Sequence, residues 1–135
     1  MALTQLASSF SGKRILCIGD IMLDRYIYGS VVRVSPEAPI PVLSESHERT
    51  MLGAVGNVAR NVVALGGQAV VVSVVGDDDA ARTLVRLMSE QEGIIADLHT
   101  VAERKTTVKT RYVSKGQQLL RADREDVRPL SDHDQ

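Results

Sequence analysis

The sequence contains no tryptophan, and all aromatic residues together make up only 3% of its 135 residues. Domains that bind single-stranded nucleic acid usually stack the bases on aromatic side chains. The formal net charge is −1, so the chain also has no excess of positive charge to attract a polyanion. Both observations argue against a nucleic-acid partner.

Cysteine is equally scarce, because Cys17 is the only one. A single cysteine excludes an internal disulfide, and with only three histidines the sequence offers no Cys/His zinc cluster. Cys17 lies between Leu16 and Ile18 in an apolar run, so we expect a buried, inert thiol. No metal ligand and no catalytic nucleophile is predicted from these residues.

Long apolar runs are also missing, since no segment reaches the roughly 18 residues that a membrane span requires. Residues 1–12 lack the basic start and the apolar stretch of a signal peptide. We therefore expect a cytoplasmic protein with no membrane partner. Its length fits one ordinary domain.

A glycine-rich stretch is the feature around which the chain is organised. Residues 53–56 read Gly-Ala-Val-Gly and lead into a run with helical spacing that Gly66 ends, which predicts a helix over about 56–65. Such a helix start lets a ligand approach the backbone closely. Asn57 falls at this start. It either caps the helix, which is the favoured interpretation, or offers its amide to a ligand hydroxyl.

Apolar runs at 14–18, 68–75 and 94–98 predict strands. The β-branched run at 68–75 requires cover on both faces, which indicates a parallel sheet between helix layers. Ligands gather at the carboxyl ends of such strands, so Asp20 and Asp24 are candidate site residues. For Asp20, support of a turn is an equally weighted alternative.

Residues 25–50 differ in character, because strand-forming residues flank a proline-rich segment at 35–41. This pattern predicts an antiparallel flap that interrupts the α/β alternation. His47 lies among charged residues and is expected at the surface. Further along, the acidic triplet 77–79 is predicted to cap the helix that follows, with metal binding as the minor alternative.

Residues 104–124 carry seven Lys or Arg residues but only one acid, Asp123. Strand-forming residues surround Lys115-Gly116, so we predict a basic hairpin that turns there. Beside a glycine-rich helix start, such a hairpin can hold a phosphorylated ligand. Its lysines are better explained as protection of a sheet edge. For Arg111 and Arg121 both interpretations stay open.

The two ends of the chain predict little. Residues 2–10 favour a short surface helix, and residues 131–135 look like the first turn of another. About three core strands and a flap make a small parallel sheet. We therefore expect the chain to be part of a larger protein, and its open sheet edge to pair with another chain.

Four segments, taken in order, resemble the ribokinase-like (PfkB) carbohydrate kinases: 19–26, 35–42, 53–61 and 117–123. The first and third are shared widely across these kinases. The Ser-Pro-Glu-Ala-Pro and Gln-Gln-Leu-Leu-Arg-Ala-Asp stretches point to the heptose branch, whose kinase serves lipopolysaccharide synthesis and is often fused to an adenylyltransferase. The resemblance covers roughly residues 5–135, which is less than half of a complete kinase.

The resemblance implies an α/β fold, namely the N-terminal part of a ribokinase-like three-layer αβα fold with a small β-lid. The lid strands would come from about 25–50 and 104–123, residues 1–12 would be an N-terminal segment, and the remainder would be the α/β core. Kinases of this family form homodimers lid to lid, so a homodimer is implied.

The implied reaction is ATP-dependent phosphorylation of D-glycero-β-D-manno-heptose 7-phosphate at its anomeric hydroxyl. Asp24 and Asn57 match contacts with the acceptor sugar, and Gly53 matches the turn beside it. Arg121 matches a lid position able to hold the acidic group of the acceptor. ATP and Mg²⁺ would be held by residues outside this chain.

Two departures from the family pattern matter. The family usually has two adjacent glycines in its turn, whereas Ala54 follows Gly53 here, and its methyl group narrows the approach to the backbone. The family's Gly-Ala-Gly-Asp motif, which supplies the aspartate base and backbone donors, does not occur. We therefore expect an acceptor-binding portion that does not catalyse by itself. The alternatives are a kinase for another sugar or nucleoside, and a non-catalytic sugar-phosphate-binding or dimerisation module.

Overall fold

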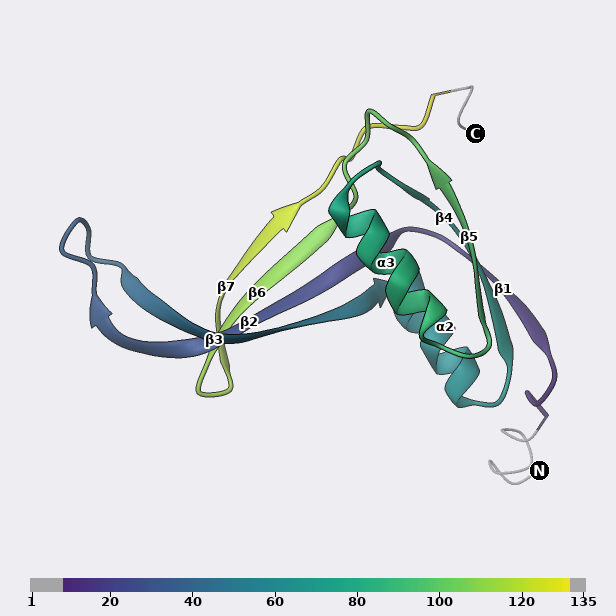
Figure 1. The fold of residues 1–135 in the computed structure, drawn as a ribbon, viewed down its shortest axis with the longest axis horizontal. Coiled ribbons are helices and arrows are strands. Elements are labelled where there is room, and N and C mark those ends of the chain that lie inside the picture. The colour runs from purple at the N-terminus through teal and green to yellow at the C-terminus, as the bar shows by residue number, and fades with distance from the viewer. Residues whose placement is uncertain (1–8, 132–135) are drawn as a thin grey trace.

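The computed structural model describes residues 9–131, which form two sheets and two helices (Figure 1). The short helix expected over 2–10 falls largely outside the described residues, and Ser9 and Phe10 lie in a turn. The helical turn expected at 131–135 also lies outside them, except for Ser131, which is not helical. Within 9–131, neither helix is long and apolar enough to cross a membrane.

The first sheet, called here the core sheet, contains three parallel strands in the order β1-β4-β5. These are β1 (Arg14–Ile18), β4 (Gln68–Val75) and β5 (Ile94–Thr100), which agree with the three predicted strands. Helices α2 (Val55–Ala64) and α3 (Asp79–Ser89) pack on one face of this sheet (Figure 1). Cys17 is a free thiol buried under them, as predicted.

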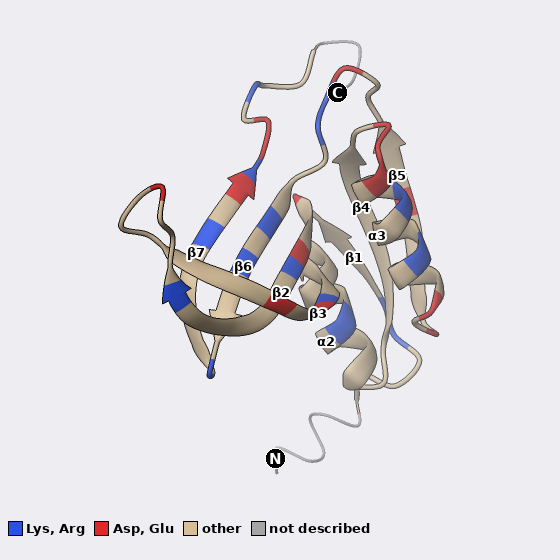
Figure 2. Cartoon of the chain, turned by 60° about the vertical axis from the view of Figure 1, so that its left-hand side comes forward, with Lys and Arg blue, Asp and Glu red and all other residues tan. Residues whose placement is uncertain are grey.

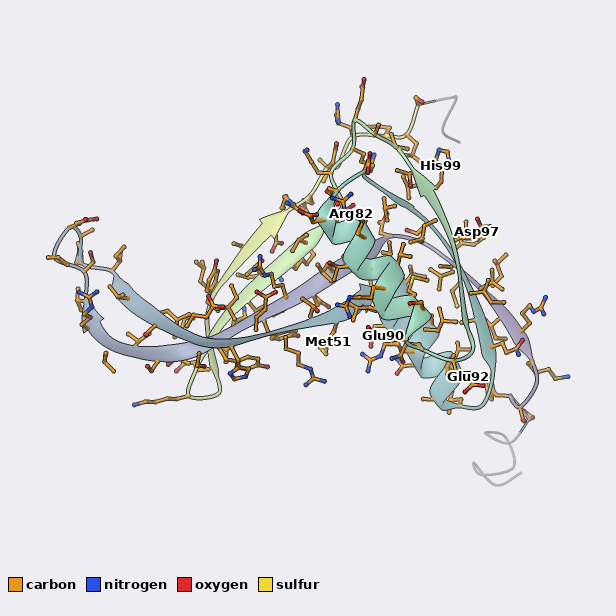
Figure 3. All side chains as sticks on the ribbon, in the orientation of Figure 1. Met51, Arg82, Glu90, Glu92, Asp97 and His99 are labelled. Atoms are coloured by element: carbon orange, nitrogen blue, oxygen red, sulfur yellow. The ribbon has the colours of Figure 1, made fainter. Side chains whose placement is uncertain are left out.

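The opposite face of the core sheet carries no helix within residues 9–131. Leu16, Ile18 and Ile95 are exposed there, and Asp97 and His99 lie on the side of β5 away from the helices (Figure 3). The expectation of helix layers on both faces is therefore met on one face only. The β-branched pattern of β4 correctly signals a strand that two layers should cover, but the two described helices both take the same side.

The second sheet, called the lid sheet, has four strands in the order β3-β2-β6-β7. They are β2 (Ile21–Val34), β3 (Pro41–Ala54), β6 (Val108–Ser114) and β7 (Gln117–Arg124). β2 pairs antiparallel with β3 and parallel with β6, and β6 and β7 form the predicted hairpin around Lys115-Gly116. Both turn residues have positive φ, as in a type I′ turn.

The lid strands differ from the prediction at their ends. β2 begins at Ile21, because Gly19-Asp20 is a two-residue connection and not a longer loop. The β2–β3 ribbon also continues past its pairing with β6, which ends at Gly29↔Ser114, and so projects as an arm (Figure 1). At the other end, β6 starts only at Val108, because Thr106 is buried in a loop contact.

Asp78 joins the core to the lid. One carboxylate oxygen accepts a hydrogen bond from the Ala81 N–H (3.0 Å) and caps α3, as the acidic triplet predicted. The other oxygen accepts from the Thr106 N–H (3.1 Å), just before β6. The Thr106 hydroxyl in turn accepts from the Gly76 N–H (2.9 Å). A single side chain thus serves a helix end and the entry to a lid strand.

Asp78→Asn is expected to separate these two roles. The asparagine oxygen still caps α3, but its amide nitrogen faces the Thr106 N–H and cannot accept its hydrogen bond. We expect a loss of about 1–2 kcal/mol in urea unfolding, and about 1 kcal/mol more for Asp78→Ala, which also removes the cap. The control is Asp77→Asn at a neighbouring exposed carboxylate. Equal urea midpoints for Asp78→Asn and Asp77→Asn would show that the contact with Thr106 carries no stability.

The same contacts make stability depend on pH. Burial alone raises the pKa of Asp78, but the hydrogen bonds from Ala81 and Thr106 and the charge of Arg124 outweigh it and lower the pKa. A lowered pKa in the folded state gives stability above the pKa of an unfolded aspartate, about 4, that is lost as the pH falls through the folded-state value. We expect the difference in unfolding free energy between wild type and Asp78→Ala to shrink below about pH 4.

Candidate functional site

A cleft of about 1000 Å³ lies between the two sheets. The carboxyl ends of β1 and β4 line one side of it, and the start of β2 and part of β6 line the other. This is the place that the strand pattern predicted for a ligand. Asp20 and Met22 both line it, the latter on the lid side next to Lys109.

Asp24 lies within β2, two residues beyond Met22, and not in a loop as the strand–turn pattern suggested. Because side chains alternate along a strand, Asp24 and Met22 share one face of the lid. The Asp24 carboxylate accepts a hydrogen bond from Nη1 of Arg111 at 2.5 Å. The two side chains are 17% and 19% exposed, so this ion pair is mostly screened from water. Asp24 itself does not line the cleft but stands beside its lid-side wall.

Gly53 lies opposite Met22 in the β2–β3 ladder and is buried. A Cβ atom at this position would lie 2.5 Å from Oδ2 of Asp24 and 2.7 Å from Cγ of Met22. Glycine is required here because the Asp24 carboxylate occupies the space of a side chain. The sequence predicted a turn beside the ligand at this residue. The structure instead places Gly53 at the end of a strand, in contact with another candidate residue.

Arg121 lies on β7 directly opposite Arg111 on β6. Its Nε donates to Asp123 (2.9 Å), which also pairs with Lys109 (2.9 Å). Figure 2 shows the resulting bands of positive charge across β6 and β7, with acidic residues at the end of β7. The structure thus brings Asp24 and Gly53 into contact and places Arg121 opposite Arg111, the partner of Asp24.

Arg111 is held by contacts of more than one kind. Besides its bond to Asp24, its guanidinium lies 5.1 Å from the centre of the Tyr26 ring, in a cation–π contact. Burial lowers the pKa of Arg111, but the hydrogen bond and charge of Asp24 outweigh it, and the pKa is raised overall. Tyr26 stacks on Tyr28, whose ring stacks on His47 at 4.6 Å. His47 is exposed, as predicted.

Asn57 does not cap α2, so the favoured interpretation of this residue is wrong. The helix begins at Val55, which puts Asn57 inside its first turn, and the N-cap position belongs to Ala54, without any side-chain hydrogen bond. The Asn57 side chain is exposed, and no described contact joins it to Asp24 or Arg111. The pattern misplaced the cap because β3 runs into the helix with no intervening loop.

Ala54 adopts φ 48° and ψ −123°, a backbone conformation that glycine adopts readily and alanine does not. We expect Ala54→Gly to stabilise the chain by about 1 kcal/mol, because relief of about 1–3 kcal/mol of strain exceeds the entropy that glycine adds to the unfolded chain. The urea midpoint should rise. An unchanged or lower midpoint would mean that the alanine is not strained.

Asp20 supports the turn between the sheets through its backbone, since its carbonyl accepts from the Val55 N–H (3.1 Å). Its side chain is exposed and lines the cleft. The structure is therefore compatible with both interpretations of Asp20, as support of a turn and as a candidate site residue. Within residues 9–131, no three His, Cys, Asp or Glu side chains are grouped to hold a metal ion.

The Asp24–Arg111 pair could not be predicted from the sequence, because its members lie 87 residues apart. The sequence feature that marked Arg111 and Arg121 as candidates is their position within predicted strands, where alternate side chains share one face of the sheet. Which residue of β2 they face depends on the register between β2 and β6, which a single sequence does not reveal. The second role of Asp78, toward Thr106, was missed for the same reason.

Comparison with known proteins identifies the group to which the chain belongs. A family model described as pfkB family carbohydrate kinase matches residues 13–135. The chain is 55% identical over 124 residues to the bifunctional protein HldE of Caulobacter sp. strain K31, covering 92% of this chain and 25% of that protein. For HldE of Paramagnetospirillum magneticum the identity is 50%, covering 97% and 27%. The chain thus spans about a quarter of the length of these curated relatives.

Solved structures agree on the fold. A carbohydrate kinase from Agrobacterium tumefaciens superposes with a TM-score of 0.66 at 23% identity, covering 83% of this chain and 35% of that one. The Arabidopsis thaliana ribokinase complexed with ribose and ATP gives 0.60 at 17% identity, covering 86% and 36%. At these identities the likeness concerns the fold, which is the N-terminal part of a ribokinase-like fold. By sequence and by fold, the chain belongs to the pfkB family of carbohydrate kinases.

Proposed function

We propose that this chain is the acceptor-binding and lid-bearing part of an ATP-dependent kinase for D-glycero-β-D-manno-heptose 7-phosphate. The proposal is supported by identity with HldE proteins over almost the whole chain and by the heptose-type stretches at 35–39 and 117–123. The observation that carries it is the Asp24–Arg111–Arg121 group beside the cleft. It combines a hydroxyl acceptor with donors for a phosphate.

The proposed roles follow from the chemistry of each side chain. The Asp24 carboxylate accepts hydrogen bonds from acceptor hydroxyls, and Gly53 leaves room for it. Arg121 holds the phosphate, and Asn57 offers its amide to the sugar from the first turn of α2. ATP supplies the transferred phosphoryl group, and ATP and Mg²⁺ would be held by residues outside this chain.

We propose that the isolated chain does not catalyse phosphoryl transfer. Phosphoryl transfer depends on positioning and on stabilisation of developing charge, and a base must take the proton of the acceptor hydroxyl. The Gly-Ala-Gly-Asp segment that serves these tasks in the family does not occur in this sequence. Binding of the acceptor is therefore the activity to measure.

Calorimetric titration of the chain with heptose 7-phosphate, and separately with ATP, tests the proposal. We expect sugar binding that weakens in Asp24→Ala and Asn57→Ala, and no ATP binding. Glu92→Gln, in the exposed turn before β5 and outside the cleft lining, is the control and should bind as wild type does. ATP binding without sugar binding would overturn the proposal. Tighter binding of another sugar would show that the chain belongs to a kinase of this family whose acceptor is not heptose 7-phosphate.

We further propose that the chain dimerises through its lid. The arm formed by the far ends of β2 and β3 is apolar at its tip, where Val32, Val34 and Ile40 are exposed. A second copy of the lid can cover these residues, which is consistent with the resemblance to lid-to-lid dimers.

Val32→Asp is therefore expected to shift the chain from dimer to monomer in light scattering, because a charge in an apolar interface is costly to bury. Val127→Asp, an equally exposed valine outside the lid strands, is the matched control and should leave the mass unchanged. A wild-type chain that is monomeric at 100 times the working concentration would contradict lid dimerisation.

A further inference from the structure

Two arginines face each other across the β6–β7 hairpin, Arg111 and Arg121. Like charges directly opposite one another destabilise a sheet. Each guanidinium has one carboxylate partner, Asp24 for Arg111 and Asp123 for Arg121. These ion pairs moderate the repulsion but use only part of the donor capacity, because a guanidinium carries five N–H groups on three nitrogens.

The unused donors lie on the same face of the lid sheet. Within residues 9–131, Arg111 donates only through Nη1, to Asp24 and to the Lys109 carbonyl (3.4 Å), and Arg121 donates only through Nε. Among the described residues, no fully buried side-chain nitrogen or oxygen lacks a partner. The Arg111 side chain is 19% exposed and the Arg121 side chain is 50% exposed, so solvent reaches both arginines on the lid face that also carries Asp24 and Met22.

Arg111 is also preorganised. Asp24, the Lys109 carbonyl and the Tyr26 ring fix its guanidinium from three directions. A ligand that binds to it does not have to order a long flexible side chain, which is the usual cost of binding through arginine or lysine. Arg121 is half exposed and, among the residues that the structure describes, is held by Asp123 alone, so it can adjust to the ligand.

We propose that Arg111 determines the specificity of this kinase for a phosphorylated acceptor. Its free N–H groups bind the phosphate together with Arg121, while its bond to Asp24 fixes the carboxylate that receives the sugar hydroxyls. This inference rests on the proposed function, and it assigns to Arg111 a contact with the ligand that the bond to Asp24 alone does not require. Three phosphate oxygens match the fork-like donors of two arginines.

The alternative role for Arg111 is purely positional, in which it orients Asp24 and touches no ligand. The two roles predict different effects of an Arg111 substitution on the binding of phosphorylated and unphosphorylated sugars. A positioning residue affects phosphorylated and unphosphorylated sugars alike, because both use Asp24. A phosphate contact affects only the phosphorylated one.

The first experiment titrates the ¹⁵N-labelled chain with inorganic phosphate at constant ionic strength and follows the arginine Nε signals. We expect Arg111 and Arg121 to shift, and the exposed Arg33 on the arm not to shift. Arg111→Gln should weaken phosphate binding at least about tenfold, as for loss of a charge-assisted hydrogen bond. Absence of any shift at Arg111 and Arg121 would overturn the proposal.

Arg111→Lys is a second variant that keeps the test valid if Arg111→Gln does not fold. Lysine keeps the charge beside Asp24 and so preserves the fold, but it offers a single ammonium group that Asp24 already occupies. We expect this variant to fold and to lose phosphate binding as Arg111→Gln does. Wild-type phosphate affinity in Arg111→Lys would overturn the two-arginine site, and Arg33→Gln serves as the control for general loss of charge.

The second experiment compares heptose 7-phosphate with unphosphorylated heptose by calorimetry. Arg111→Gln should weaken the first at least about tenfold and change the second less than about threefold. Equal loss for both sugars would leave Arg111 as a positioning residue only and overturn the proposal. If phosphate binds at the two arginines but heptose 7-phosphate binds no tighter than phosphate, the proposed function fails while the anion site stands.

Discussion

Gly53→Ala is expected to abolish acceptor binding and to cost about 1–3 kcal/mol of stability, as overpacking of a tightly filled site does. The added Cβ would lie 2.5 Å from Oδ2 of Asp24 and 2.7 Å from Cγ of Met22. The Asp24 carboxylate cannot simply swing away, because Arg111 holds it. The change therefore breaks the Asp24–Arg111 pair, and calorimetry with heptose 7-phosphate and urea unfolding should report both losses.

A double-mutant comparison identifies the clash. In an Asp24→Ala background the oxygen that meets the new Cβ is gone, so Gly53→Ala should cost clearly less there than in wild type. Equal costs in the two backgrounds would mean that Met22 or the backbone, and not Asp24, requires glycine at this position.

Leu84→Ala is expected to be the most destabilising substitution in the core, at about 2–5 kcal/mol. Leu84 lies on the inner face of α3, is completely buried, and is among the largest buried side chains. Its removal leaves a cavity where α3 packs against the rest of the core cluster. Such a loss is a large fraction of the 5–15 kcal/mol by which a domain is usually stable.

The neighbouring residue provides the control. Val85 is 49% exposed on the same helix, so Val85→Ala should change the unfolding free energy by less than about 1 kcal/mol, with better helix propensity offsetting lost contacts. Urea unfolding followed by circular dichroism measures both variants. Similar midpoints for the two would contradict the burial of Leu84.

Features that depend on a few neighbouring residues could be predicted from the sequence. The β-branched run of β4 marked the central strand of the core sheet, and Asp78 was correctly predicted to lie at a helix cap. Lys115-Gly116 correctly marked the turn of the basic hairpin. Each depends on local backbone preferences, which a short segment carries within itself.

Features that depend on register could not be predicted. Asp24 and Arg111 meet because β2 and β6 are parallel neighbours with Tyr26 opposite Arg111, and no local pattern encodes that alignment. The misplaced cap at Asn57 has a similar origin, because nothing in residues 51–57 shows that β3 continues to Ala54. The candidate residues could be predicted individually, but their contacts could not.

The connections between the lid sheet and the core are very short. Gly19-Asp20 is the whole connection between β1 and β2, α2 follows β3 directly, and the Ile21 N–H donates to the Ser73 hydroxyl of the core sheet (2.9 Å). Lid residues such as Leu23 and Val108 also belong to the same buried cluster as Leu84.

The two sheets should therefore unfold in one cooperative transition. The chain carries its own reporters for this, because its three tyrosines all lie in lid strands while both helices lie against the core sheet. Tyrosine fluorescence then follows the lid and helical circular dichroism follows the core. Coincident melting curves from the two signals are the spectroscopic consequence of a connection only two residues long.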